Sequence, residues 1–255
     1  MSMAKDSHND NGEGMHLRDE VIALACEEAH RKVFENFQSS NIFQLDRDIP
    51  LPRIEAAEIV SGKLLGKGSF SFVKEIKHID LNIKVLRRRS PSSQTITIAS
   101  GEGRATGSDD EQIKLKRQSS ISSFVEDVLS GDCRYVIKNI APDSKNNAEK
   151  LRCALMNMVV ETHYLSVIEH PNVIKLHAVG HTDMFCPDNF LVLERLYSTL
   201  PDKIAGWKKE MKWKNRTPLL KKVRGKTRNI DGTFTQRLAI GCDMASALEY
   251  LHGLK

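Results

Sequence analysis

The fold expected for this chain depends on one stretch, Leu65-Gly66-Lys67-Gly68-Ser69-Phe70-Ser71-Phe72-Val73. The segments around its glycines, 59–65 and 70–79, are short and rich in β-branched and aromatic residues. Two such segments joined by a glycine-rich turn predict a β-hairpin. A Rossmann loop would open into a helix and a Walker loop would end in Gly-Lys-Ser/Thr, and neither continuation is present. The stretch therefore predicts a hairpin whose bare backbone is suited to approach phosphate groups.

Two elements further along the chain supply a cation and a carboxylate. The strand predicted over 133–140 (CRYVIKNI) carries Lys138, and the helix predicted over 148–168 carries Glu161. The apolar face of that helix consists of Leu151, Leu155, Met158, Val159, Thr162 and Leu165. A carboxylate on the inward side of an apolar helix requires a cation, because burying it unpaired is costly. We therefore expect Glu161 to contact Lys138, and the alternative is an exposed Glu161 without a role.

The order of these elements resembles the eukaryotic protein kinase family over roughly residues 60–255. Gly66, Gly68 and Val73 match the family's pattern G-x-G-x-x-G-x-V, with Ser71 in the place of the third glycine. The V-A-I-K strand of the family is matched by Tyr135-Val136-Ile137-Lys138. The sequence His-Pro-Asn at 170–172 follows Glu161 at the family's interval, residues 190–196 (FLVLERL) resemble the fifth strand and hinge, and residues 237–252 resemble the long helix before the catalytic loop.

The resemblance implies a nucleotide site with ATP as its ligand. Lys138 would contact the α- and β-phosphates and Glu161 would hold it there, so these two are the expected catalytic residues. Leu193 would be the gatekeeper, and the backbones of Glu194 and Leu196 would meet the adenine edge. The other expected ATP-binding residues are Leu65, Gly66, Lys67, Gly68, Ser69, Phe70, Ser71, Val73 and Val136.

The fold implied by the resemblance is α+β, with a five-stranded antiparallel sheet, one large helix and only the first helices of a second, helical lobe. Residues 1–57 are expected to form an extension and residues 58–255 a partial kinase domain. Within that domain, the first lobe and hinge would span 58–196 and the start of the second lobe 197–255.

The family reaction transfers the γ-phosphoryl group of ATP to a protein substrate, here expected at Ser or Thr. The family continues from this point into H-R-D-x-x-x-x-N, D-F-G and A-P-E, but the sequence ends at Lys255. The base and the ligands of the expected Mg²⁺ are therefore absent, and no metal-binding residue is assigned. A positioned base alone contributes about 10²–10⁴ in rate. We expect these 255 residues to bind nucleotide weakly and to be inactive alone, and the alternative is a non-catalytic nucleotide-binding or scaffold (pseudokinase-like) module.

Two polar stretches predict insertions in the domain. Residues 78–131 lack a core pattern and are expected to be mostly disordered. Residues 207–228 are strongly basic, with Glu210 as the one acid and two tryptophans interleaved. The basic stretch is either a solvated insertion or a contact for an acidic partner, such as nucleic acid, acidic lipid or a phosphorylated protein.

A helix is predicted over 17–37, because Leu17, Val21, Leu24, Ala25 and Val33 recur near helical spacing. It is expected to pack against the first lobe, or else to serve a dimer or a partner helix. The last helix is expected to expose apolar residues, since the partners that the family places around it are missing.

Composition bounds the class of protein. Hydrophobic residues make up 40% of the chain and charged residues 28%, which excludes a fibrous or wholly disordered chain. The five cysteines contain no C-x-x-C pair, which argues against a zinc site and favours reduced thiols in the cytoplasm or nucleus. No apolar run approaches the ~20 residues that span a bilayer, so no transmembrane segment is expected.

Overall fold

The structure is a computed structural model of the chain, and it describes residues 13–38, 40, 49, 51–80, 123–131, 134–216 and 232–254. The chain divides into two compact units. The first unit consists of Met1–Ile168 and Lys175–Glu194, and the second consists of Glu169–Ile174 and Arg195–Lys255.

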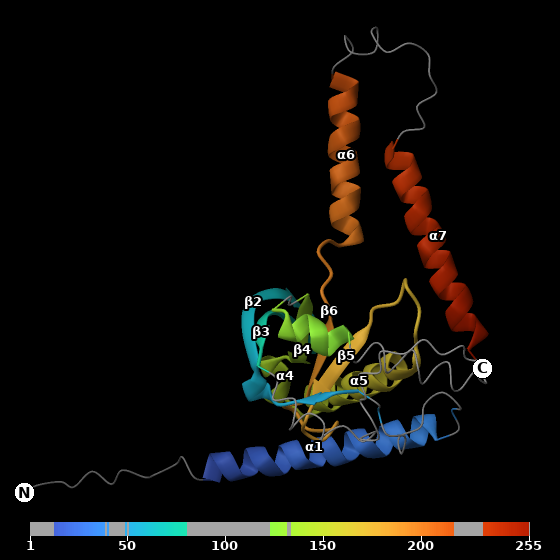
Figure 1. Ribbon diagram of the computed structural model, residues 1–255. Helices are drawn as coiled ribbons and strands as arrows, with labels where there is room; N and C mark the ends of the chain where they lie inside the picture. The colour runs from blue at the N-terminus through green and yellow to red at the C-terminus, as the bar shows by residue number, and fades with distance from the viewer. Residues whose placement is uncertain are drawn as a thin grey trace, which may run out of the picture. The chain divides into compact units, whose positions relative to one another are not determined.

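A mixed sheet of six strands, in the order β1-β5-β6-β4-β3-β2, organises the described part of the first unit (Figure 1). The fold class is therefore α+β, as predicted. Each strand is antiparallel to its neighbours from β5 through β6, β4 and β3 to β2, whereas β1 lies parallel to β5. The strands are β1 Arg53–Ile54, β2 Ile59–Lys67, β3 Ser71–Ile79, β4 Tyr135–Ile140, β5 Leu176–Gly180 and β6 Phe190–Glu194.

The strand β1 corrects the prediction of five antiparallel strands. The amide of Val179 donates to the carbonyl oxygen of Pro52 at 3.0 Å, and the amide of His181 donates to that of Ile54 at 2.8 Å. In the sequence, Pro50 and Pro52 predict a break in regular structure. At the edge of a sheet, however, a proline costs no ladder bond if its missing N–H would face outward. The fully buried side chain of Ile54 anchors the strand.

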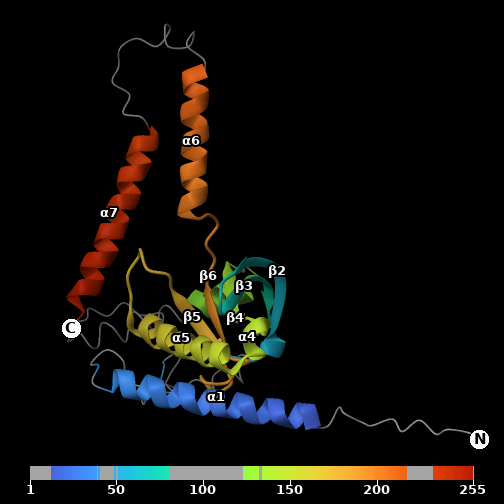
Figure 2. The same cartoon turned by 180° about the vertical axis from the view of Figure 1, so that it is seen from behind.

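Two helices are layered on one face of the sheet. The helix α5 (Ala148–Val167) contacts β4 and β5, and α1 (Glu13–Phe37) packs against α5, so that α5 lies between the sheet and α1 (Figures 1 and 2). The α5 face predicted from the sequence is largely confirmed, with Leu151, Leu155, Met158, Val159 and Thr162 all buried.

The buried face of α1 differs from the predicted one. Ala25, Ala29 and Val33 are buried, whereas Val21 and Leu24 are exposed. Positions 25, 29 and 33 recur every four residues and form one ridge of the helix. Because two of these side chains are only methyl groups, α1 can approach α5 closely. The predicted packing of this helix within the first unit is confirmed.

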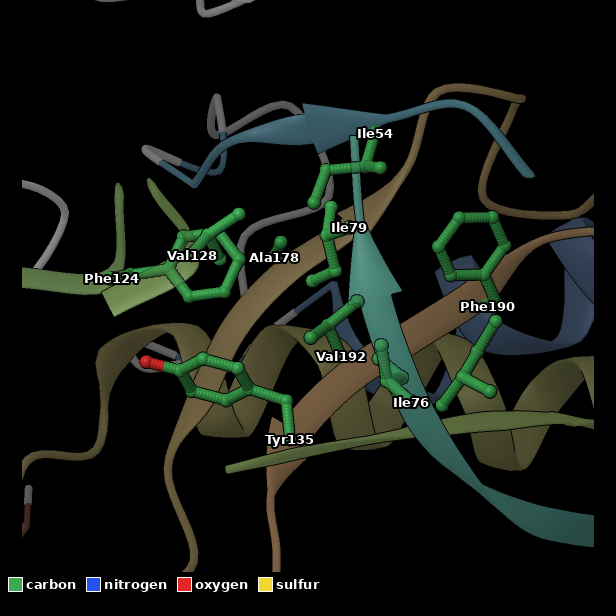
Figure 3. Close-up of a cluster of buried hydrophobic side chains, with 10 residues drawn as sticks. Ile54, Ile76, Ile79, Phe124, Val128, Tyr135, Ala178, Phe190 and Val192 are labelled. Atoms are coloured by element: carbon green, nitrogen blue, oxygen red, sulfur yellow. The ribbon is translucent and has the colours of Figure 1, made fainter. Parts of the chain in front are cut away.

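The opposite face of the sheet carries the hydrophobic core shown in Figure 3. Residues 123–129 form a short helix, and its Phe124 and Val128 are 1% and 5% exposed. They pack with Tyr135 of β4 and with residues of β1, β3, β5 and β6. The prediction that residues 78–131 are a mostly disordered insertion is therefore wrong at both ends, since β3 includes Ile79 and 123–129 belong to the core. The stretch 81–122 lies outside the described residues.

The second unit consists mainly of two helices, α6 (Leu200–Arg216) and α7 (Gly232–Gly253). Residues 207–216, the first part of the predicted basic insertion, continue α6 as helix. Trp207 is 8% exposed, and its indole N–H donates to Oε1 of Gln236 at 3.1 Å. Residues 217–231 lie outside the described ranges.

The predicted exposure of apolar residues on the last helix is confirmed, since Phe234, Leu238, Met244 and Leu248 of α7 are each more than half exposed. No helix within the described ranges is both long enough and apolar enough to cross a membrane.

Candidate functional site

The centre of the candidate site is the ion pair between Lys138 and Glu161. The Nζ atom of Lys138 in β4 donates to Oε2 of Glu161 in α5 at 2.5 Å. Their side chains are 21% and 30% exposed, so the pair is partly shielded from water. The expected contact between these two residues is present, and it connects β4 to α5, the helix that covers this face of the sheet.

The glycine hairpin lies in register with this pair. Gly66 of β2 is opposite Val73 of β3, and Val73 is opposite Lys138 of β4. Residues directly opposite one another in antiparallel strands point to the same face of a sheet. Val73 and Lys138 therefore share the face on which α5 and Glu161 lie.

The predicted hairpin is confirmed, with its turn at residues 68–70. The amide of Gly68 donates to the carbonyl oxygen of Ser71 at 2.7 Å, which closes the turn. Gly66 has open space where a Cβ would stand, and a Cβ on Gly68 would meet Ser71 at ordinary contact distance. The described residues therefore leave room for a side chain at both glycine positions. Ser69, at the tip of the turn, is exposed.

Apolar side chains lie beside the ion pair on the same face. Val136 precedes Lys138 by two residues on β4, so both point to one side of the sheet. Val136 is opposite Leu193 of β6, and the two are 5% and 4% exposed. Leu65 of β2 is 38% exposed. The sequence-predicted residues for the adenine ring thus include a buried pair on β4 and β6 and a more exposed residue on β2.

The tip of the hairpin is anchored to the short helix α4 (Pro142–Lys145), a connection that the sequence did not indicate. The amide of Ala141 donates to the carbonyl oxygen of Phe70 at 2.8 Å. The Nζ atom of Lys67 donates to Oδ2 of Asp143 at 2.6 Å, and this hydrogen bond lowers the pKa of Asp143, with Lys67's charge acting in the same direction. The one available signal is the Pro-Asp dipeptide after the strand, which is typical of a helix start.

The two predicted hinge residues fall in different units. Glu194 ends β6, and its Oε1 accepts a hydrogen bond from the amide of Lys175 at 3.0 Å. Leu196 belongs to the second unit and is 67% exposed.

Within the second unit, the His-Pro-Asn turn is joined to α7. The His170 ring stacks on Tyr250 with centroids 5.1 Å apart, and its Nε2 lies 3.2 Å from the Ser246 hydroxyl. The Asn172 side-chain amide donates to the carbonyl oxygen of Asp243 at 3.1 Å. These contacts explain why an exposed turn carries His and Asn.

The resemblance implies Mg²⁺ beside the nucleotide. The described residues contain no group of three or more His, Cys, Asp or Glu side chains that could hold a metal ion. The Glu161 carboxylate is already bound by Lys138.

A separate hollow lies at the first turn of α5, lined by Val21, Ile22, Leu151 and residues 145–148. Glu161 is about 20 Å further along the helix axis at 1.5 Å per residue. The hollow shares no lining residue with the predicted nucleotide site.

No family model matches the chain, and no curated protein matches it.

Proposed function

We propose that residues 58–255 form the ATP-binding portion of a domain of the protein kinase type. The observation that carries this proposal is the 2.5 Å contact between Lys138 and Glu161, in register with the glycine hairpin through Val73. An ammonium held by a carboxylate beside bare backbone is suited to a triphosphate, because it supplies a fixed positive charge and accessible N–H groups.

Each residue of the site has a distinct part in this proposal. Lys138 donates to the α- and β-phosphate oxygens, and Glu161 orients it. The turn at Gly66 and Gly68 lets backbone amides approach the phosphates, since neither glycine presents a side chain. The apolar side chains of Val136, Leu193, Leu65 and Val73 contact the adenine ring.

The sheet supports the proposal in part. The five strands β5-β6-β4-β3-β2 are antiparallel, in agreement with the first lobe implied by the resemblance, and β1 is an addition to it. The reaction proposed for the family is transfer of the γ-phosphoryl group to Ser or Thr of a protein substrate. The cysteine pattern favours a reducing compartment, and we place the protein in the cytoplasm or nucleus on that ground.

The second candidate function is a non-catalytic nucleotide-binding or scaffold module. The chemistry of the ion pair is the same in both cases, because holding a triphosphate requires the cation and its carboxylate but not the base.

A calorimetric titration with ATP tests the proposal. The chain is expected to bind ATP, and Lys138→Met is expected to weaken binding by tenfold or more, since a charge-assisted contact contributes roughly 1.5–3 kcal/mol. The matched control is Lys77→Met, which removes an exposed lysine of β3 and should leave binding unchanged.

Two outcomes would reject nucleotide binding at this site. One is an unmodified chain that binds neither ATP nor ADP at millimolar concentration, and the other is equal affinity in Lys138→Met. A parallel assay of phosphate transfer to a peptide is expected to show no transfer by these 255 residues under either candidate, and transfer would exclude the non-catalytic module.

A further inference from the structure

Two cysteines of the first unit come from segments that are far apart along the chain. Cys26 belongs to α1, and Cys186 belongs to the loop of residues 181–189 that joins β5 to β6. Both side chains are partly exposed, and both are free thiols. A small oxidant can therefore reach either sulfur atom.

The loop contacts α1 one helical turn away from Cys26. The ring of His30 meets the ring of Phe185 edge-on, with centroids 4.8 Å apart. His30 follows Cys26 by four residues, so the two side chains lie on the same side of α1. Phe185 directly precedes Cys186 in the loop. The contact between the rings therefore brings the segments that carry the two cysteines together.

The position of Cys186 is fixed by hydrogen bonds within the loop and by packing on α1. The amide of Cys186 donates to the carbonyl oxygen of Asp183 at 3.0 Å, and the amide of Asn189 donates to the carbonyl oxygen of Cys186 at 3.0 Å. Phe185 packs against the buried cluster that contains Val33 of α1. The loop is thus held in a defined conformation against the helix.

The ionisation of Cys26 agrees with this placement. Burial raises the pKa of the Cys26 thiol, and the negative charges of Cys186, Asp183 and Glu27 raise it further, in that order. Cys186 therefore acts on Cys26 more strongly than Glu27 does, although Glu27 is adjacent in sequence. Because the interaction of two charges weakens with distance, the two cysteine side chains are near neighbours.

We propose that Cys26 and Cys186 form a redox modification site, at which hydrogen peroxide joins α1 to the β5–β6 loop through a disulfide bond. The sulfur of one cysteine attacks a peroxide oxygen and becomes a sulfenic acid, and the other oxygen leaves as water. The sulfur of the second cysteine then attacks the sulfenic sulfur, which forms the S–S bond and releases a second water. The two sulfur atoms together lose two electrons, the peroxide gains them, and both thiol protons end in water.

The bond would hold α1 in place on the helix that carries Glu161, because α1 packs against α5. It would also close a loop of about 160 residues, which restricts the unfolded chain and so favours the folded one. A thiol reductant reverses the bond by exchange. A reversible disulfide is compatible with a reducing compartment, where such bonds are transient and sense oxidants. The inference is independent of nucleotide binding.

Peptide mapping tests the proposal, because the five cysteines lie in five different tryptic peptides. The full chain is treated with equimolar hydrogen peroxide, its remaining thiols are alkylated, and it is digested with trypsin without reduction. The expected main product is a disulfide between peptides 19–31 and 176–195, which contain Cys26 and Cys186. Dithiothreitol should remove this product, and the oxidised chain should migrate as a monomer on a non-reducing gel.

Urea unfolding measures the effect of the bond on the fold. The oxidised chain should unfold at a higher urea concentration than the reduced chain. Cys26→Ser and Cys186→Ser should each lose both the cross-link and this shift. The matched control is Cys153→Ser, which replaces a partly exposed cysteine of α5 and should retain both.

The proposal fails if the digest of the oxidised chain lacks the cross-link between peptides 19–31 and 176–195, or if another cysteine pairing exceeds it. It also fails if the cross-linked chain migrates as a dimer, or if the oxidised and reduced chains unfold at the same urea concentration.

Discussion

The Nζ atom of Lys138 lies 2.5 Å from Oε2 of Glu161. The two residues belong to a strand and a helix whose sequence patterns differ. The strand is a run of β-branched and aromatic residues, and the helix has an apolar face against the sheet. Their contact therefore depends on how α5 is laid over β4. Any change that shifts α5 should separate the pair before it unfolds the sheet.

The first prediction concerns the coupling of this pair. Lys138→Met and Glu161→Gln should each destabilise the chain by about 1–2 kcal/mol, because each leaves a partly buried polar partner unsatisfied. The double variant should lose less than the sum, with a coupling of about 1 kcal/mol in urea unfolding. Additive losses would mean that the two side chains do not interact in solution.

The second prediction concerns the carboxyl group of Asp143. The hydrogen bond from Lys67, and then the charge of Lys67, hold the pKa of Asp143 below its ordinary value of 3.8. Any stability that the pair of Lys67 and Asp143 contributes is therefore fully present above pH 3.8, and it is lost as the pH falls through the lowered pKa of Asp143. In an NMR titration, Lys67→Met should raise the pKa of Asp143 toward 3.8. Lys63→Met, the matched control on the same strand, should leave it unchanged.

The third prediction concerns acid sensitivity at His177 of β5. Burial lowers the pKa of His177 to about 4, and the ring stacks on Phe124 with centroids 5.7 Å apart. The unfolded state therefore takes up a proton between pH 6.5 and about 4 that the folded state does not.

Stability should consequently fall by about 2 kcal/mol between pH 7.5 and pH 5, as measured by urea unfolding at both pH values. His177→Gln should remove most of this fall. The loss of stability that remains in this variant should come from His163, because burial also lowers the pKa of that residue. An unchanged fall in His177→Gln would contradict the assignment.

The fourth prediction tests whether residues 123–129 belong to the core. Phe124→Ala should cost about 3–5 kcal/mol, because it removes a fully buried ring from the cluster in Figure 3. Leu129→Ala, in the same short helix but 58% exposed, should change stability by less than about 0.5 kcal/mol. If thermal unfolding finds both variants equally stable, the segment is not packed on the sheet.

The fifth prediction concerns the support that α1 gives to α5. Val33→Ala removes a side chain that is fully buried against Val159 and should cost about 2 kcal/mol. Hydrogen exchange should quicken first along α5, which carries Glu161. Leu24→Ala, on the exposed side of α1, is the control that should leave the exchange of α5 unchanged.

Much of the fold was predictable from local patterns. The hairpin, the strand with Lys138 and the helix with Glu161 were each indicated by periodicity within a short window. The sequence also indicated the partner of Glu161, because a carboxylate beside an apolar helix face needs a cation. Their proposed roles toward ATP stay predictions.

The failures of prediction have a common physical cause. Phe124, Val125, Val128 and Leu129 recur at helical spacing, but this pattern covers barely two turns within a long polar stretch. Trp207 continues the helical spacing of Leu200 and Ile204, but a run of lysines follows it and hides the pattern. The burial of Phe124 and Trp207 depends on partners far away in the chain, such as Tyr135 for Phe124 and Gln236 for Trp207.

By itself, the sequence determined the type of the elements that carry Lys138 and Glu161 and the positions of these residues on them, because hydrogen bonding and side-chain period within an element are local properties; it did not indicate the helix α6. Only the tertiary structure decided that the Pro52 segment joins the sheet, that residues 123–129 close the core and that Asp143 holds the hairpin through Lys67. Those contacts join segments that are far apart along the chain, and their free energy depends on a surface that exists only once the sheet has formed.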